Sequence, residues 1–247
     1  MICIYLGNVG SGKTVSAVRE MYKNDHIKTY SNIITKLKNQ KNLDYSMLIE
    51  KQITGEKRKK DGSIEEIYKL TINKKFWYDV KKPINVIIDE AHTILNSRRS
   101  FTKVNVLITE WLSLIRKILG DKEETGSLIF ITQLPNRLDV IARDMATLVK
   151  YHICYFTKIC SKCGSIYNEN SETPSKISHC LKCGHYKLTK HNHKIMVYEF
   201  ANMEDMDLWK KTGSKSYFNH YFINDIEKYF HLYDTLQWDN MFSELYI

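Results

Sequence analysis

The chain has 247 residues, of which 43% are hydrophobic, and its formal charge is +9, from 37 Lys and Arg against 28 Asp and Glu. This length supports one α/β core with an appendage and excludes two full nucleotide-binding lobes. The sequence has no apolar run of about 18 residues and opens on no secretory pattern, so we expect no membrane span and a cytoplasmic setting. The basic excess favours an anionic partner, nucleic acid first.

The first motif is GNVGSGKT at 7–14, between an apolar run predicted to be a buried strand over 2–6 and a helix from Lys13 to about Met21. Its glycines allow consecutive backbone N–H groups to approach a polyphosphate at the helix N-terminus. Lys13 adds a positive charge between the outer phosphates, and the Thr14 hydroxyl can ligate Mg²⁺. We therefore predict a loop that binds a nucleoside triphosphate through Gly7, Asn8, Val9, Gly10, Ser11, Gly12, Lys13 and Thr14.

A polar, Lys-rich segment at about 36–82 follows a second short strand, which is predicted over 26–32 and leaves the core. Within this segment, the partly alternating runs 47–54 and 64–72 can pair as an exposed hairpin with Asp61-Gly62 at its tip. A flexible basic insertion is the alternative.

The run INVIIDEAH at 84–92 predicts a strand buried on both faces, as in a parallel sheet, followed by two carboxylates. Ligands of open α/β sheets bind at this end of the strands. Asp89 can therefore hold Mg²⁺ through water, and Glu90 can polarise the attacking water. These two carboxylates are the second half of the predicted nucleotide site.

Apolar residues at helical spacing predict a core helix over 103–119, which Gly120 ends. A buried strand follows at 127–132, with Gln133 at its tip, where it can touch the γ-phosphate or the attacking water or simply cap the strand. A short helix over 137–146 and a strand over 147–156 complete this part of the chain.

Six cysteines divide into two groups. CSKCG at 160–164 and CLKCGHY at 180–186 are two CxxCG knuckles whose four thiolates suit tetrahedral Zn²⁺, a closed and therefore structural site. Neighbouring histidines, His179 and His185, are alternative ligands, and a redox dithiol is the weaker alternative function. The predicted zinc ligands are Cys160, Cys163, Cys180 and Cys183. Cys3 and Cys154 lie in predicted strands and are expected to be small core residues.

Together these motifs resemble the single-domain ATPases of the FtsK/HerA-like and zonular-occludens-toxin-like branch, which occurs in viruses and mobile elements. The resemblance rests on GNVGSGKT, YSNI (30–33), INKKFWYDV (72–80), VIIDEAH (86–92), SRRS (97–100), RKILG (116–120), ITQLPNRLDVIARDMA (131–146) and YDT (233–235). It implies a RecA-like core of the additional-strand type, with three layers around a mostly parallel sheet. The zinc ribbon is not general in the branch.

The resemblance also implies a homo-oligomeric ring that binds ATP between subunits and pumps duplex DNA, often into a capsid. Lys13 and Thr14 would serve the phosphates and Mg²⁺, Asp89 the metal, Glu90 the water, and Gln133 would act as a sensor. Such a ring needs an arginine supplied by the neighbouring subunit. The best candidates are Arg98 and Arg99, followed by Arg116, Arg137 and Arg143.

The expected organisation is an ATPase core at 1–157, an inserted zinc ribbon at 158–190, and a segment at 191–247 that completes the core and ends in helix. A DEAH-box helicase is excluded, because it needs two lobes in one chain. A DNA translocase, an ATP-dependent assembly factor that acts on capsid or other proteins, and a slow nucleotide switch remain as functions. The intact carboxylate pair argues against the switch.

Overall fold

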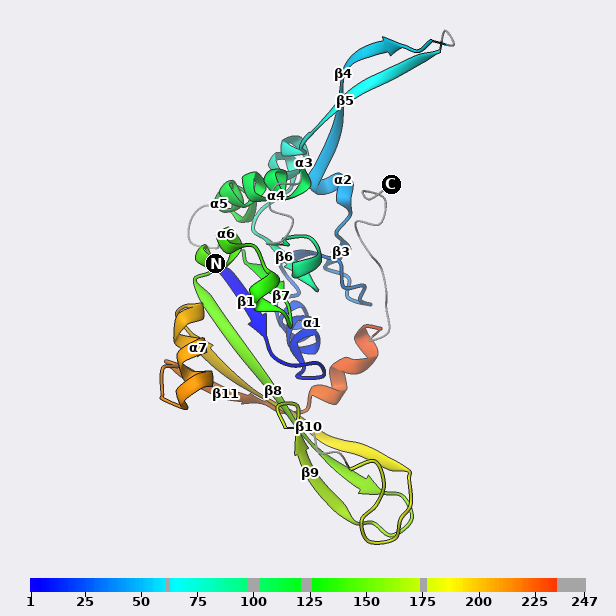
Figure 1. The fold of residues 1–247 in the computed structure, drawn as a ribbon, viewed down its shortest axis with the longest axis vertical. Coiled ribbons are helices and arrows are strands. Elements are labelled where there is room, and N and C mark those ends of the chain that lie inside the picture. Colours follow the sequence, from blue (N-terminus) through cyan, green and yellow to red (C-terminus); the bar gives the residue numbers. More distant parts are fainter. Residues whose placement is uncertain (61–62, 97–102, 121–125, 174–176, 235–247) are drawn as a thin grey trace.

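The computed structural model describes residues 1–60, 63–96, 103–120, 126–173 and 177–234, and most of its strands join one twisted sheet (Figure 1). In chain order these strands are β1 (Ile2–Leu6), β2 (Lys28–Ser31), β3 (Gln40–Asn42), β6 (Ile84–Ile88), β7 (Leu128–Ile131), β8 (Leu148–Cys160), β9 (Ile166–Asn170), β10 (Leu188–Phe200) and β11 (Asn219–Ile223). Across the sheet their order is β11-β10-β8-β1-β7-β6-β2-β3, and β9 pairs with β8.

The centre of this sheet is parallel. Strand β1 pairs in parallel with β7 and β8, and β6 pairs in parallel with β7 and β2. Strand β7 therefore stands between β1, which leads into the phosphate loop, and β6, which leads into the acidic pair. This interposed strand defines the additional-strand arrangement, so the predicted fold class is confirmed. Strands β10 and β11 extend the sheet in antiparallel fashion.

Helices cover both faces of the sheet and make it the middle of three layers. One face carries α1 (Lys13–Lys23) and the 3₁₀ helix η4 (Ile226–Leu232). The other carries α3 (Lys74–Asp79), α4 (Lys103–Ser113), α5 (Ile115–Leu119), α6 (Val140–Asp144) and α7 (Met203–Thr212). Strand β1 divides its side chains between the layers: Ile2, Ile4 and Leu6 pack under α3–α7, and Cys3 and Tyr5 pack under α1. None of the described helices combines the length and apolar character of a membrane-spanning segment.

Two predicted elements differ in the structure. The helix expected over 103–119 is broken at Leu114 into α4 and α5, because Leu114 N donates to Trp111 O and Lys117 N to Leu114 O, the tight spacing of a 3₁₀ turn. The strand expected to leave the core, β2, instead lies inside the sheet. Its Tyr30 pairs with Val86 of β6 on one side and Lys41 of β3 on the other.

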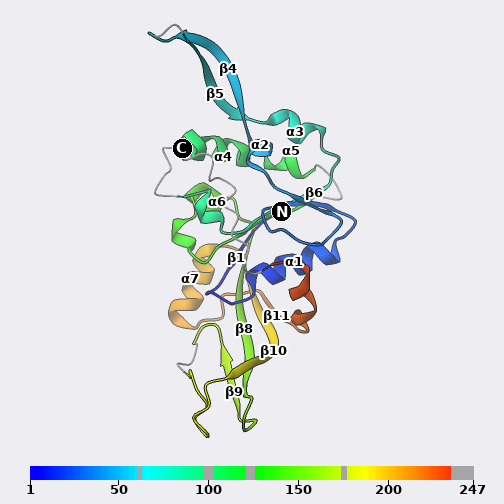
Figure 2. The ribbon, with the colours of Figure 1, turned by 90° about the vertical axis from the view of Figure 1, so that its right-hand side faces the viewer.

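A two-stranded arm projects from one end of the molecule, in both views of the ribbon (Figures 1 and 2). It consists of β4 (Ile49–Arg58) and β5 (Ile64–Ile72), which pair antiparallel. The short helix α2 (Tyr45–Leu48) and the buried pair Ile49 and Ile72 fix its base in the core. Of the two alternatives for this segment, the structure contains the hairpin, and the predicted tip Asp61-Gly62 lies outside the described residues.

A second appendage, which we call the ribbon (158–190), projects from the opposite end (Figure 1). It grows from β8 and β10, which are 13 residues long each and pair from Val149–Phe200 out to Cys160–Leu188. Strand β9 adds to the free edge of β8 there. The ribbon is therefore a direct continuation of two strands of the central sheet.

Candidate nucleotide site and metal centre

The phosphate loop adopts the backbone that its glycines were expected to allow. Gly7, Gly10 and Gly12 have φ values of 142°, 74° and 90°, which L side chains rarely adopt. A side chain at Gly12 would also collide with Ile195 of β10. The loop leads from β1 into α1, as predicted, so the N–H groups of the first helical turn face the place where phosphates would bind.

Lys13 is nearly enclosed, with 8% of its surface exposed. Its Nζ donates to Gly7 O at 2.9 Å and to Asn8 O at 3.0 Å. Burial lowers the pKa of this ammonium, and the nearby carboxylates of Asp89 and Glu90 oppose that effect. The carbonyls of Gly7 and Asn8 thus hold the Lys13 ammonium within the phosphate loop. From there the ammonium can move directly to a phosphate oxygen of a bound nucleotide.

Thr14 and Asp89, the two residues predicted to serve Mg²⁺, are in direct contact. The Thr14 hydroxyl donates to Asp89 Oδ2 at 2.8 Å. A hydroxyl and a carboxylate oxygen at this distance match the hard oxygen donors that Mg²⁺ takes in phosphate-loop enzymes. The residues present therefore fit this ion.

Asn32, at the end of β2, holds the acidic turn and was not assigned a role from the sequence. Asp89 N donates to Asn32 Oδ1 at 2.7 Å, and Asn32 Nδ2 donates to Asp89 O at 2.9 Å. The YSNI motif was the available signal, but a lone asparagine after a short strand has no specific spacing. Its role became visible only when β2 was found beside β6.

Glu90 sits in a left-handed backbone conformation, with φ 50° and ψ 42°. For a non-glycine residue this conformation is uncommon and concentrates at functional sites. The Glu90 carboxylate receives a hydrogen bond from Gln133 Nε2 at 3.3 Å and lies 3.3 Å from His92 Nδ1. The structure therefore brings the predicted water-activating residue and the predicted sensor residue together from β6 and β7.

Burial is the largest influence on the pKa of each carboxyl group in the acidic pair. Burial raises the pKa of Asp89, against the lowering effects of its hydrogen bonds from Thr14 and from the Glu90 backbone. Burial also raises the pKa of Glu90, and the neighbouring Asp89 carboxylate adds to this increase. A carboxylate with a raised pKa is a stronger base, which suits a group that takes a proton from water.

The arginine candidates remain predictions. Arg98 and Arg99 lie outside the described residues. Arg116 and Arg137 are exposed, and Arg143 is half-buried. Within the described part of the chain, no arginine forms a hydrogen bond or ion pair with Asp89 or Glu90.

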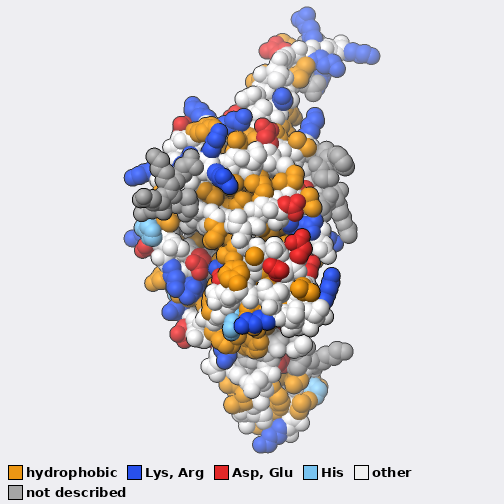
Figure 3. All heavy atoms as spheres, turned by 90° about the vertical axis from the view of Figure 1, so that its left-hand side faces the viewer, with side chains coloured by type: hydrophobic (Ala, Val, Ile, Leu, Met, Phe, Trp, Pro, Cys, Tyr) orange, Lys and Arg blue, Asp and Glu red, His pale blue; other side chains and the backbone are white. Residues whose placement is uncertain are grey.

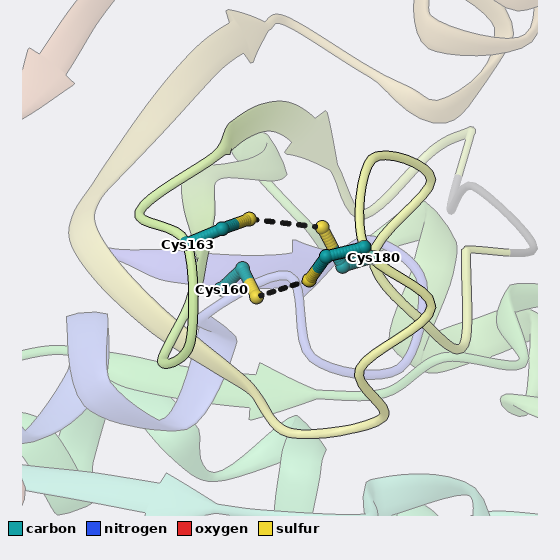
Figure 4. Close-up of side chains that lie close together, drawn as sticks. Cys160, Cys163 and Cys180 are labelled. Atoms are coloured by element: carbon teal, nitrogen blue, oxygen red, sulfur yellow. Dashed lines mark hydrogen bonds between the residues drawn. The ribbon is translucent and has the colours of Figure 1, made fainter.

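The two CxxCG knuckles meet at the end of the ribbon. Ligand atoms of Cys160, Cys163, Cys180 and Cys183 all lie within 4.8 Å of one another. Figure 4 shows Cys163 facing Cys180, whose sulfurs are 3.4 Å apart, and the sulfurs of Cys160 and Cys183 are 3.7 Å apart. Four sulfurs at about 2.3 Å from one tetrahedral ion would lie about 3.8 Å apart. The cluster is compatible with zinc.

Each knuckle is closed by the glycine that follows it. Gly164 N donates to Cys160 O at 2.9 Å and Gly184 N to Cys180 O at 2.8 Å. Both glycines have positive φ, 71° and 69°. Nε2 of the alternative ligand His185 lies 3.1 Å from Ser161 Oγ, and neither His179 nor His185 joins the cluster of ligand atoms in the described part of the chain. The matched geometry explains why both knuckles carry glycine at the same position.

The other two cysteines are buried in the sheet, as expected. Burial raises the pKa of the Cys3 thiol to about 12 and that of Cys154 to about 11. At neutral pH both thiols are protonated and unreactive.

The interposed strand β7, the phosphate loop and the Asp89–Glu90 pair define a phosphate-loop ATPase. A family model described as zonular occludens toxin (Zot) matches residues 1–157. The chain therefore belongs to the zonular occludens toxin family. A search of curated proteins finds no significant match.

Three matches among solved structures can be compared with this chain. The N-terminal domain of zonular occludens toxin from Neisseria meningitidis is 16% identical, with 94% of this chain and 98% of that chain covered and a TM-score of 0.46. The genome packaging NTPase B204 from Sulfolobus turreted icosahedral virus 2, in complex with ATP-gammaS, is 16% identical, with 61% and 74% covered and a TM-score of 0.35. The same NTPase with AMPPCP is 17% identical, with the same coverage and TM-score. At these values, the family assignment rests on the family model.

Proposed function

We propose that the protein is an ATP-driven motor that assembles into a homo-oligomeric ring and translocates double-stranded DNA. The observation that supports ATP hydrolysis is the contact between Glu90 and Gln133, because these two residues follow neighbouring strands at the same end of the sheet. In this proposal Glu90 takes a proton from the attacking water. Gln133 orients the Glu90 carboxylate and responds to the γ-phosphate, and Lys13 moves from the loop carbonyls to the phosphates.

Mg²⁺ would be held by Thr14 and Asp89 and would supply charge neutralisation at the β- and γ-phosphates. Asn32 would keep Asp89 in position through its two backbone hydrogen bonds. The arginine that such a site needs would come from the neighbouring subunit, with Arg98 and Arg99 as the first candidates. This requirement is our reason for proposing a ring.

In the ribbon, we propose one structural Zn²⁺ per chain on Cys160, Cys163, Cys180 and Cys183. The ribbon's own hydrophobic support is small: Cys160 and Cys180 are its only buried apolar residues among the described positions 158–190. A fold of this size without a core needs a metal or disulfides to be stable.

DNA is proposed as the substrate because basic side chains gather at both ends of the molecule. Figure 3 shows Lys and Arg at the arm and at the tip of the ribbon. Lys57, Arg58, Lys59 and Lys60 at the end of the arm are exposed, and so are Lys162 and Lys182 of the ribbon. Contacts of this type bind phosphates without reading sequence and weaken steeply with salt.

One ribbon lysine, Lys158, already has partners within the ribbon. Lys158 Nζ lies 3.0 Å from Glu169 Oε2 and donates to Ile177 O at 3.1 Å. The Glu169 side chain is 2% exposed, so this pair is internal to the ribbon. The ribbon also contains Lys162, Lys176 and Lys182, of which Lys176 lies outside the described residues. The proposed ribbon contacts are therefore Lys162 and Lys182.

The test is ATP turnover at low salt with duplex DNA, with single strands and without DNA. We expect a several-fold rise with duplex that is lost when Lys57, Arg58, Lys59 and Lys60 are changed to Glu. A control reverses the charges of Lys211 and Lys215, which are exposed at the end of α7 and just beyond it. A particle that stays monomeric and whose turnover ignores DNA at every salt concentration would reject the translocase.

A second candidate function is an assembly ATPase that moves protein. The observation that favours it is a row of apolar side chains along one face of the arm, where Tyr68, Leu70 and Ile72 alternate along β5 and Ile53 pairs with Tyr68, while Ile64 lies beyond Glu66 on the same strand. Ile53, Ile64 and Tyr68 are 63%, 63% and 55% exposed. Exposed apolar surface of this kind marks protein contacts. Turnover that rises with capsid or assembly proteins and not with DNA would favour this function.

A further inference from the structure

A cavity of about 270 Å³ opens beside the phosphate loop and extends to β8, β10 and η4. The loop residues Gly10, Gly12, Thr14 and Val15 line one end of it. The other end is lined by aromatic and apolar side chains of β8, β10 and η4, which are Cys154, Phe156, His193, Ile226 and Phe230, together with Tyr233. Neither the hydrolytic residues nor the zinc centre account for this second end.

An extra residue in β10 builds the aromatic wall. Strands β8 and β10 shift register between His191 and Lys194, so two residues of β10, Asn192 and His193, stand opposite Phe156. Asn192 has a φ of 53°, an uncommon value for a residue with a side chain. A bulge interrupts the inside–outside alternation of a strand and re-aims side chains, often beside functional sites. Here it leaves both His193 and Lys190 on the cavity side with Phe156.

The aromatic groups are held in fixed relation to one another. Phe156 and His193 stack with ring centroids 5.8 Å apart and 29° between their planes, and Phe230 meets His193 edge-on at 5.7 Å. The Glu227 carboxylate orients the imidazole, since its Oε1 lies 2.8 Å from His193 Nδ1 and accepts from His193 N at 3.2 Å. In η4, the buried Ile226 and Tyr229 anchor the helix that carries Phe230.

The position of the cavity in the sheet indicates which part of a bound nucleotide would enter it. In the sheet order, β8 and β6 lie on opposite sides of β1, and the acidic pair follows β6. A triphosphate on the loop, with its γ-phosphate toward Glu90, therefore directs its nucleoside end toward β8 and the cavity. Flat aromatic side chains attract the flat face of a nucleobase, and a base stacks on them whatever its identity.

We propose that the base of the bound nucleotide stacks in this cavity, against Phe156, His193 and Phe230, which we call the base slot. The proposal rests on the nucleotide site proposed above and deepens it. Lys190, whose Nζ lies 4.5 Å from the centre of the Phe156 ring, covers that ring until the base enters. The long stem of a lysine can move aside at little cost.

The experiment measures binding by titration calorimetry, in the presence of Mg²⁺, with AMPPCP and with inorganic tripolyphosphate as probes. We expect the wild-type chain to bind AMPPCP more tightly than tripolyphosphate. Phe156→Ala and Phe230→Ala should each weaken AMPPCP binding by roughly 5- to 150-fold, the range for loss of one base-stacking partner, and leave tripolyphosphate binding unchanged. Phe156→Leu and Phe230→Leu, which keep the cavity filled, should also weaken AMPPCP alone.

The matched control is Phe222→Ala in β11, on the opposite face of the same sheet, where Phe222 is 46% exposed and meets Tyr155 at 6.2 Å. It should change neither affinity. Equal affinity of the wild type for the two probes, or unchanged AMPPCP binding in the Leu variants, would overturn the base slot. Absence of binding to both probes would reject the nucleotide site itself, and turnover that ignores DNA would reject only the motor.

Discussion

Asn32 and Asp89 are joined by two hydrogen bonds. Both bonds use backbone atoms of Asp89, and neither uses its carboxylate. The side chain of Asn32, which follows β2, thus fixes the main chain of Asp89, which follows the neighbouring strand β6 and lies 57 residues away in sequence. Asp89 keeps its two carboxylate oxygens for Thr14 and for the Glu90 N–H. The direction of the acidic pair is therefore set by a residue that need never touch the nucleotide.

Asn32→Ala should lower the rate of ATP hydrolysis and also the free energy of unfolding. Two partly buried backbone groups of Asp89 would lose their partner, a loss of about 1–3 kcal/mol for each unsatisfied group. Steady-state turnover and urea unfolding measure the two effects. Asn219→Ala is the control, because the Asn219 side chain donates to Glu199 Oε2 at the edge strand β11, outside the nucleotide site. Unchanged turnover in Asn32→Ala would show that the turn at Asp89 and Glu90 keeps its conformation without the Asn32 side chain.

Glu90→Gln should leave ATP binding nearly intact and slow hydrolysis by about 100-fold or more, because it removes the base and keeps the shape. Single-turnover hydrolysis and nucleotide binding separate the two effects. Glu110→Gln, on the exposed side of α4, is the control and should match the wild type. Lys13→Ala should instead weaken binding and turnover together. A wild-type rate in Glu90→Gln would make the assignment of the base wrong.

The rate of hydrolysis should fall on the acid side at a pH above the ordinary glutamate pKa of 4.5, because burial and Asp89 raise the pKa of Glu90 and its ionised form is the active base. A pH–rate profile measures this limb. His92 must be separated from it, since His92 contacts Glu90 and burial lowers its own pKa from 6.5. His92→Gln should keep the acid limb. If the acid limb of the pH–rate profile disappeared in His92→Gln, the limb would belong to the titration of His92 and not of Glu90.

Asp89→Asn should make the nucleotide-free, Mg²⁺-free protein more stable at neutral pH while it abolishes hydrolysis. Burial raises the folded-state pKa of Asp89 above its unfolded value of 3.8. The wild type therefore loses stability as pH rises from that value through the folded-state pKa, and the loss persists at pH 7. Asparagine cannot ionise and lacks this loss. Thermal unfolding against pH measures it, with the exposed Asp207→Asn as control. A lower melting temperature in Asp89→Asn at pH 7 would contradict the prediction.

Purified protein should contain one zinc ion per chain. Cys163→Ser should release it and increase hydrogen exchange across the ribbon, because only three thiolates remain, while AMPPCP binding by the core persists. Elemental analysis and exchange by mass spectrometry measure both effects. Cys3→Ser, in the core strand β1, should keep the zinc. Freshly purified wild-type protein that contains no zinc would contradict the proposed zinc site at this cluster.

The elements nearest the phosphate loop could be read from sequence because their chemistry is local. The loop glycines, Thr14 and the apolar run before Asp89 each have a motif with fixed spacing, and all lie where that spacing places them. The sequence placed Glu90 and Gln133 after two buried strands, and the structure adds the hydrogen bond between their side chains. Parallel strands end at one edge of the sheet, so short-range patterns sufficed.

Contacts between distant segments could not be read in this way. Asn32 acquired a role only because β2 lies beside β6, and no local pattern gives strand order. The bulge at Asn192 depends on how β8 and β10 pair on both sides of it. The face of the sheet on which His193 lies could therefore not be predicted from the sequence. The break at Leu114 lies within an unbroken apolar repeat, where hydrogen-bond geometry and not composition decides.

Both appendages leave the core through strands that are already paired at its surface. Ile49 stands opposite Ile72 at the base of the arm, and Ile159 stands opposite Thr189 at the base of the ribbon, beyond the residues of the base slot. The two chain ends at each base are therefore one strand spacing apart, about 4.8 Å, a gap that a two-residue turn can close. Either appendage can be gained or deleted in a single genetic event without displacing the residues that hold the nucleotide. The reach of the molecule can thus evolve independently of its catalytic centre.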